Sequence, residues 1–305
     1  MAIQPTSKIW MDGEYVDWDR AVVHVLTPSL HYGWGVFEGI RCYATGRGPA
    51  VFRLTEHMRR LFRSAKIYHM EPPVSLEGSV KVVKDLVAAN GLRECYVRPI
   101  VYLGYGEMGL NPLASPVRMA VACWPWGAYL GEESFATGVR VKVSSWRRLD
   151  PNVIPPAAKA TGQYLNSSLA KAEAVKAGYD EGVLLNAQGY VTDGSGENLF
   201  VVRGGVLVTP PLAAGCLAGV TRDSVMRIAV DEGVRVAESE LVRTDLYLAD
   251  EAFFTGTAAE VVPIREVDDR VLGEPGPVTR RLQEVFRAAT RGQDQRYADW
   301  LEPVE

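Results

Sequence analysis

Cysteines and long apolar runs are scarce in this 305-residue sequence. Its four cysteines lie far apart, without metal-binding or redox spacing, at Cys42, Cys95, Cys123 and Cys216. We therefore expect reduced thiols in the core of a cytoplasmic protein, and no metal site. No apolar run approaches the length of a membrane span, and the N-terminus lacks the apolar core of a signal peptide, so no membrane partner is expected.

Basic tracts are also missing, and the net charge is −4. This charge balance argues against nucleic acid as a main partner. The composition is that of a globular protein, with 47% hydrophobic and 23% charged residues. A chain of this length is long enough for two domains of ordinary size.

The order of strand-like and helix-like patterns predicts an α+β fold with mixed sheets in two domains. A run rich in Pro, Gly and aromatic residues at 124–133 is expected to connect a small N-terminal domain, 1–123, to a larger C-terminal domain, 134–305. One helix is expected to follow Thr55, which would cap it, and further helices are expected at 75–90, 163–177, 221–232 and 278–289. Strands are expected at 35–43, 50–54, 94–103, 117–124, 182–185, 198–202, 206–209, 234–238, 251–255 and 261–267, with Gly204-Gly205 as a hairpin turn.

Lys159 has the most distinctive surroundings, because its sequence neighbours from Pro155 to Tyr164 are small, apolar or uncharged. A lysine in an apolar setting can lose its proton and act as a nucleophile that forms a Schiff base with a carbonyl. An ordinary exposed lysine is the alternative, since most lysines are solvated.

Two further segments have the character of anion sites. Gly219 precedes a predicted helix, so the N–H groups of Val220 and Thr221 are expected to point at an anion. Many ordinary helices also begin with a Gly and a Thr cap. A turn of small residues from Gly256 to Ala259 offers further N–H groups, with the hydroxyl of Thr257 beside them.

Asp193 lies in a glycine-rich segment and is a candidate acid for the ring nitrogen of a cofactor, although a plain Asp-Gly turn has the same pattern. Tyr96 and Arg98 alternate along a predicted strand, so both side chains point to one face, where they can bind a carboxylate. An ordinary exposed strand face is the alternative there. Together with Lys159 and the two anion sites, these residues form the set that a pyridoxal-phosphate enzyme needs.

Taken together, these segments resemble the class IV (fold type IV) aminotransferases, and within them the bacterial branched-chain amino acid aminotransferases. The similarity covers nearly the whole chain, and several independent motifs occur in the right order. They are HYGWGVFEGIRCY at 31–43, EHMRRL at 56–61, YVRP at 96–99, MGLNP at 108–112, PWGAYLG at 125–131, AAKATGQYL at 157–165, GSGENLF at 194–200, TPP at 209–211, GVTRD at 219–223 and GTAAE at 256–260.

The resemblance implies a role for each matching residue. Lys159 is the Schiff-base lysine and moves a proton, Tyr164 hydrogen-bonds the ring oxygen, and Asp193 faces the pyridine nitrogen. The residues that hold the cofactor phosphate are implied to be Arg60, Val220, Thr221 and Thr257. The residues that contact the substrate are implied to be Tyr32, Phe37, Tyr96, Arg98, Met108, Leu110, Trp126, Tyr129, Tyr164, Thr257 and Ala258.

The implied activity is reversible transamination between L-leucine, L-isoleucine or L-valine and 2-oxoglutarate, with pyridoxal 5′-phosphate, by a ping-pong route. Aromatic side chains accept the apolar substrates, and Arg98 binds the second carboxylate of glutamate. In this family Met108 and Leu110 lie on a loop that reaches over from the neighbouring protomer. A homo-oligomer is therefore expected, with a dimer as the minimum, and hexamers are common in the bacterial family.

Two positions depart from the family pattern. Asp193 stands where the family usually has Glu, which is longer by one CH2, and Glu197 is its near competitor for the ring nitrogen. Trp34-Gly35 replaces a small or polar pair, so Trp34 is expected either to narrow the pocket mouth or to pack at an interface. The alternatives on this fold are a D-amino acid or (R)-amine transaminase, an aminodeoxychorismate lyase and, more remotely, a non-catalytic metabolite-binding protein.

Overall fold

The computed structural model describes residues 3–127 and 133–304, and the chain folds into two compact units. The first unit comprises Met1–Trp126, Ala158–Gly162 and Ala289–Glu305, and the second comprises Gly127–Ala157 and Gln163–Ala288. This division differs from the expected one, because the short segment with Lys159 and the C-terminal segment both pack with the first unit. Within the described ranges, no helix is long and apolar enough to cross a membrane.

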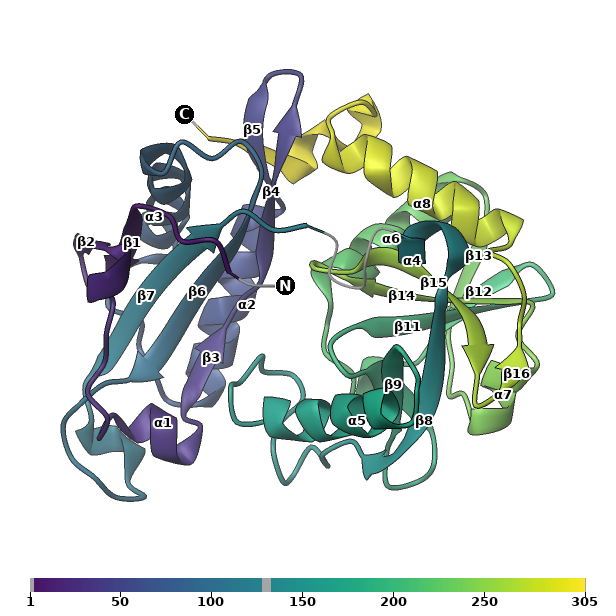
Figure 1. The fold of residues 1–305 in the computed structure, drawn as a ribbon, viewed down its shortest axis with the longest axis horizontal. Helices are drawn as coiled ribbons and strands as arrows, with labels where there is room; N and C mark the ends of the chain where they lie inside the picture. The colour runs from purple at the N-terminus through teal and green to yellow at the C-terminus, as the bar shows by residue number, and fades with distance from the viewer. Residues whose placement is uncertain (1–2, 128–132, 305) are drawn as a thin grey trace. The chain divides into compact units, whose positions relative to one another are not determined.

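The first unit contains one sheet, in the strand order β17-β5-β4-β6-β7-β1-β2, with β3 beside β6 (Figure 1). All the pairings found between its described strands are antiparallel. The elements of this unit are β1 (Lys8–Met11), β2 (Glu14–Asp17), η1 (Trp18–Arg20), α1 (Pro28–Tyr32), β3 (Gly35–Phe37), β4 (Ile40–Thr45), β5 (Gly48–Phe52), α2 (Leu54–Ile67), α3 (Leu76–Ala89), β6 (Cys95–Leu103), η2 (Pro112–Ala114), β7 (Val117–Trp124), η4 (Gln295–Trp300) and β17 (Leu301–Pro303).

Helices α2 and α3 pack their apolar sides against this sheet. Met58 and Leu61 of α2 and Leu86 of α3 are fully buried and share one core with strand residues such as Val97. The helix expected at 75–90 is α3, and the hydroxyl of Ser75 caps it by accepting a 3.0 Å hydrogen bond from the Gly78 N–H.

Helix α2 begins slightly earlier than expected. Its N-cap is Arg53, whose φ is 48°, and Thr55 lies in the first turn instead of capping it. The reason is a tertiary contact, because the Thr55 N–H donates to Glu302 Oε1 at 2.7 Å and its hydroxyl donates to Oε2 at 3.0 Å. The C-terminal segment therefore accepts hydrogen bonds from the first turn of a helix that is 247 residues away in sequence.

The second unit contains the mixed sheet, in the order β10-β9-β8-β15-β14-β11-β12-β13, with β16 beside β15. Its parallel pairs are β8 with β9, β8 with β15, and β12 with β13. The mixed pairing expected for both sheets is thus found only here. The elements are α4 (Glu133–Thr137), β8 (Val139–Arg147), α5 (Tyr164–Lys176), β9 (Glu181–Leu185), β10 (Val191–Gly194), β11 (Asn198–Arg203), β12 (Val206–Thr209), η3 (Leu212–Ala214), α6 (Val220–Asp231), β13 (Arg235–Glu238), α7 (Arg243–Tyr247), β14 (Glu251–Gly256), β15 (Glu260–Val267), β16 (Arg270–Val271) and α8 (Pro277–Thr290).

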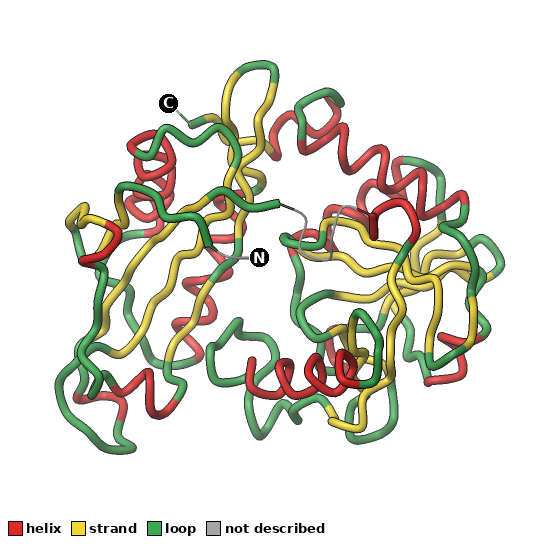
Figure 2. Tube along the Cα trace, in the orientation of Figure 1, coloured by secondary structure: helices red, strands yellow, loops and turns green. Residues whose placement is uncertain are grey.

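Strand β10 also pairs with β11, so β10, β9, β8, β15, β14 and β11 close into a ring. The strands are the yellow segments in Figure 2. Closure leaves these strands without a free edge among themselves. Val141, Val183, Leu199 and Val262 are buried in the apolar core of this unit. The hairpin between β11 and β12 turns at Gly204 and Gly205, both with positive φ, as the sequence predicted.

Candidate active site

Lys159 is held by its backbone on both sides within the first unit. Its N–H donates to Ser64 Oγ of α2 at 3.0 Å, and its carbonyl accepts from the Phe37 N–H of β3 at 3.0 Å. The Lys159 Nζ lies 5.3 Å from the centre of the Phe37 ring. Lys159 therefore lies in a short strand-like segment that runs beside β3, with the bridge between Val36 and Ala160 extending the pairing.

Two glycines, Gly33 and Gly162, allow the segment that carries Lys159 to lie close to the residues that precede β3. The Gly162 N–H donates to the Gly33 carbonyl at 3.1 Å, and Gly33 has a φ of 67°. A Cβ on Gly33 would lie 2.8 Å from Gly162 Cα, which is too short for any real contact. The glycines of two motifs are thus used to bring the lysine segment against the sheet.

Arg60 of helix α2 is mostly buried. Its Nε and Nη2 donate to the two oxygens of Glu38 at 2.6 and 2.8 Å. His57 Nδ1 lies 2.9 Å from Glu38 Oε2. Burial alone raises the pKa of Glu38, but the charge of Arg60 and the hydrogen bonds from Arg60 and His57 outweigh it and hold that pKa well below its usual range.

The pKa of His57 is lowered from its ordinary value. Burial lowers its pKa most, the Glu38 carboxylate raises it, and the positive charges of Arg60 and Lys159 lower it further. The face of α2 that carries His57, Arg60 and Ser64 therefore lies against both Glu38 and the lysine segment.

Phe37, Tyr96 and Arg98 come together on the first unit, with Tyr96 and Arg98 on one face of β6 as expected. Arg98 Nη2 donates to Tyr96 Oη at 3.2 Å, and the guanidinium lies 4.7 Å from the Phe37 ring centre. The ring of Trp126 lies 5.1 Å from that of Tyr96. Among the residues that the structure describes, Arg98 Nε and Trp126 Nε1 are buried without a hydrogen-bond partner. Buried donors of this kind are costly unless a ligand uses them.

The remaining predicted residues of the first unit lie nearer its surface. Tyr32, Met108 and Leu110 are 43%, 46% and 85% exposed. Trp34 packs with its ring 5.4 Å from Tyr68, edge to face, against the core of this unit. Tyr129 lies outside the described residues.

Asp193 in the second unit is buried, and both of its oxygens accept hydrogen bonds. Asn198 Nδ2 donates to Oδ1 at 2.8 Å, and the Leu217 N–H donates to Oδ2 at 3.0 Å. Arg148 Nη2 lies 3.8 Å from Oδ2. Burial raises the pKa of Asp193 by more than the charge of Arg148 and these hydrogen bonds lower it, so the pKa lies above its ordinary value. The hydrogen bonds fix the orientation of the Asp193 carboxyl group.

Glu197, the competitor of Asp193, is buried in a different way. Its Oε2 accepts from the Gly196 N–H at 3.1 Å and would lie 2.9 Å from a Cβ on Gly194. Burial, and then the negative charge of Glu181, raise the pKa of Glu197 to about 8. A carboxyl group with this pKa is mostly protonated at neutral pH, so Glu197 is the poorer partner for a protonated ring nitrogen.

The predicted phosphate segments lie at the start of α6 and in the turn between β14 and β15. Helix α6 begins at Val220 after the N-cap Gly219, which has no side chain to cap the helix. Val220 and Thr221 are buried, and Thr257 and Ala258 form the half-buried turn between β14 and β15. A helix N-terminus that opens with glycine suits a phosphate. With the buried Asp193 carboxylate in the same unit, these donors fit a phosphorylated pyridine cofactor. Tyr164 is the first residue of α5.

Sequence reasoning missed Glu38, His57, Ser64, Arg148 and Asn198. The sequence contained a signal for two of them, because His57 and Ser64 lie three residues before and four residues after Arg60 and thus on its helix face. The others had no such signal, since each acts across contacts between separate elements.

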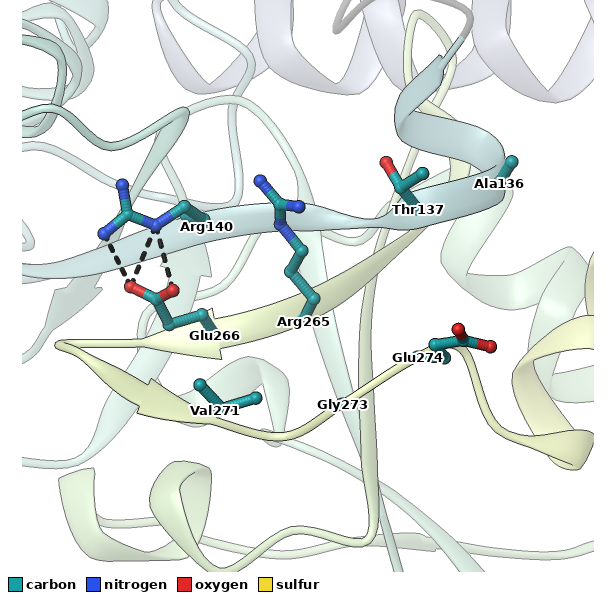
Figure 3. A pocket seen from close by; sticks show the side chains of 8 residues that line it. All are labelled: Ala136, Thr137, Arg140, Arg265, Glu266, Val271, Gly273 and Glu274. Atoms are coloured by element: carbon teal, nitrogen blue, oxygen red, sulfur yellow. Dashed lines mark hydrogen bonds and ion pairs between the residues drawn. The ribbon is translucent and has the colours of Figure 1, made fainter.

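A surface pocket of about 630 Å³ lies elsewhere on the second unit (Figure 3). Its charged lining includes Arg140, which donates to Glu266 with distances of 2.7 to 2.9 Å, and the side chains of Arg265 and Glu274. None of the predicted site residues lines this pocket. It is therefore distinct from the candidate active site.

Comparison with known proteins identifies the family. The class IV amino-transferase profile matches residues 35–267. The branched-chain-amino-acid aminotransferase of Escherichia coli (strain K12) is 46% identical over 307 aligned residues, which cover 100% of this chain and 99% of that protein.

Solved structures agree with this comparison. The crystal structure of the Escherichia coli branched-chain amino acid aminotransferase superposes with a TM-score of 0.96 at 46% identity, over 98% of this chain and 100% of that one. The branched-chain aminotransferase of the thermophilic archaeon Thermoproteus uzoniensis, solved with norvaline, has a TM-score of 0.95 at 48% identity, over 98% and 100% of the two chains. A further branched-chain amino acid aminotransferase, complexed with N-(5′-phosphopyridoxyl)-L-glutamate, has a TM-score of 0.95 at 47% identity, over 99% and 100% of the two chains. The predicted resemblance and fold type are confirmed, and this chain belongs to the class IV aminotransferase family.

Proposed function

We propose that this chain catalyses reversible transamination between L-leucine, L-isoleucine or L-valine and 2-oxoglutarate, with pyridoxal 5′-phosphate as its cofactor. Similarity over the full length to branched-chain aminotransferases supports the activity. The observation in the structure that carries it is the fixed backbone of Lys159 beside Phe37 and Ser64. When bound, pyridoxal phosphate supplies an electron sink for negative charge at the substrate Cα.

Lys159 is proposed to be the Schiff-base lysine and the group that removes and returns the proton at the substrate Cα. Its backbone is fixed at the N–H and at the carbonyl, so the amine moves only through rotation of its own side chain. A fixed origin with a flexible four-carbon arm suits a group that must both hold the cofactor and transfer a proton.

The second unit is proposed to supply the acid and the main phosphate ligands. Asp193 holds a proton on the ring nitrogen, because it is the carboxylate with a cationic partner and two hydrogen-bond donors. Val220, Thr221 and Thr257 bind the phosphate, with Arg60 as a further ligand, and Tyr164 hydrogen-bonds the ring oxygen.

Substrate recognition is proposed to combine an apolar wall with one cation. Phe37 and Trp126 contact the branched side chain, and Tyr32 and Tyr129 complete this wall. Tyr96 and the N–H groups of Thr257 and Ala258 receive the α-carboxylate. Arg98 binds the second carboxylate of glutamate, for which its buried Nε is an available donor.

An amino-donor panel tests this function against its relatives on the same fold. The purified protein is supplied with 2-oxoglutarate and with L-leucine, D-leucine or an (R)-amine. We expect glutamate formation with L-leucine and little with the other two donors. Faster turnover of D-leucine or the amine would contradict the proposal, and so would release of pyruvate from aminodeoxychorismate.

We also propose a homo-oligomer with a dimer as its smallest active unit. Val25, Leu30, Leu110 and Leu113 are 62% to 85% exposed on the first unit. His24 and Tyr105 connect their two segments through rings 4.4 Å apart. Exposed apolar side chains grouped in this way are typical of interaction surfaces, and Met108 and Leu110 are then available to a neighbouring protomer.

A cytoplasmic location is proposed as well. All four cysteines are free thiols, and all are buried. Free thiols are the state that the reducing cytoplasm maintains.

A further inference from the structure

Asn198 occupies the point where three predicted cofactor segments meet in the second unit. It is the first residue of β11 and pairs with Asp193 of β10 on one side and with Thr255 of β14 on the other. Directly opposed residues in antiparallel strands have Cα atoms about 4.5 to 5.5 Å apart. The acid and the strand that leads to the Thr257 turn are therefore its immediate neighbours.

The side chain of Asn198 adds the third segment. Its Nδ2 donates to Asp193 Oδ1 at 2.8 Å and also to the Leu217 carbonyl at 2.9 Å. Leu217 in turn donates its N–H to Asp193 Oδ2 at 3.0 Å. One amide group thus connects the acid to the chain that enters α6.

The carbonyl end of the same amide lies against the helix cap. A Cβ on Gly219 would lie 1.9 Å from Asn198 Oδ1, so only glycine fits at that position while Asn198 keeps its place. Gly219 has a φ of −68°, which any residue adopts, so the need for glycine here comes from this contact and not from its backbone.

We propose that Asn198 is a positioning residue that holds the Asp193 carboxylate and the N-terminus of α6 in fixed register for the ring nitrogen and the phosphate of one cofactor. This inference rests on the proposed function. Asn198 acts through its contacts with Asp193 and Gly219.

The test measures cofactor binding by the full-length holoenzyme and four variants. These are Asn198→Ala, Gly219→Ala, the double variant, and Asn186→Ala as the matched control. Asn186 donates to the Ala214 carbonyl at 3.1 Å and accepts from the Tyr190 N–H in the turn between β9 and β10. The readouts are the dissociation constant of pyridoxal phosphate and the ¹⁵N chemical shift of the labelled ring nitrogen, which reports its protonation.

Asn198→Ala is expected to weaken pyridoxal phosphate binding roughly 10- to 100-fold, the range for losing a hydrogen bond to a charged group, and to shift the ring nitrogen toward its unprotonated form. As a single variant, Gly219→Ala is also expected to weaken pyridoxal phosphate binding. In the double variant the added methyl group occupies space that Asn198 has left, so its loss is smaller than the product of the single losses. Asn186→Ala should bind like the wild type.

Wild-type affinity and ring protonation in Asn198→Ala would overturn the inference, and so would losses that multiply in the double variant. If Asn198→Ala does not fold, Asn198→Leu gives the same decision, because it keeps the approximate size, removes both donated hydrogen bonds and adds no charge beside Asp193. A wild-type protein that binds no pyridoxal phosphate would instead overturn the proposed function, and with it the basis of this inference.

Discussion

Replacing Glu38 should destabilise the first unit far more than replacing any exposed carboxylate. Glu38 is completely buried and binds Arg60 through two hydrogen bonds and His57 through a third. Removing one partner of a buried ion pair leaves an uncompensated charge and costs about 3–5 kcal/mol. We expect a loss of this size in the free energy of unfolding for Glu38→Ala, and a smaller loss for Glu38→Gln, which keeps the volume.

The assay is urea unfolding followed by circular dichroism, at fixed subunit concentration and with saturating cofactor, because binding and association both shift apparent stability. The matched control is Asp85→Ala, which removes the exposed i,i+4 pair with Lys81. Exposed helix pairs of this kind contribute no more than about 0.5 kcal/mol. Equal losses in Glu38→Ala and Asp85→Ala would refute the reasoning.

The pH dependence gives a second criterion for the same pair. The pKa of Glu38 is lowered in the folded chain, so its stabilisation is fully present above the ordinary carboxyl pKa of about 4.3 and is lost as pH falls toward the folded value. The stability difference between wild type and Glu38→Gln should therefore be constant above about pH 5 and shrink at lower pH. A difference that grows on acidification would contradict this sign.

Four further outcomes are expected. Borohydride reduction followed by peptide mapping should place the pyridoxyl group on Lys159, and an adduct on any other lysine would refute that assignment. Arg98→Ala should reduce kcat/KM for 2-oxoglutarate by an amount equivalent to about 2 kcal/mol or more, and affect the leucine half-reaction less; equal losses would count against a role in binding the second carboxylate. Leu110→Asp should weaken the dimer and its activity together in light scattering and kinetics, whereas a fully active monomer would contradict a shared pocket. Asp193→Asn should slow proton transfer strongly while Asp193→Glu is tolerated; a near-normal Asp193→Asn beside an inactive Glu197→Gln would transfer the role to Glu197.

The amino-acid sequence alone was sufficient for features that depend on near neighbours in the chain. Alternation along β6 placed Tyr96 and Arg98 on one face, and the structure joins them by a hydrogen bond. The helix at 75–90 and the hairpin turn at Gly204-Gly205 were predicted for the same reason. Motif order was enough to identify the family, because several separate motifs rarely occur together by chance.

Only the tertiary structure decided which partners those residues have. Lys159 packs with the first unit through Ser64 and Phe37, which lie about a hundred residues away in the chain. Arg60 is mostly buried beside Glu38, whose carboxylate balances its charge. Asp193 receives its hydrogen bonds from Asn198 and Leu217 once strand pairing and the approach to α6 bring them together. Local periodicity determines which face a side chain occupies, whereas its charge state and orientation depend on contacts that form only when distant segments pack.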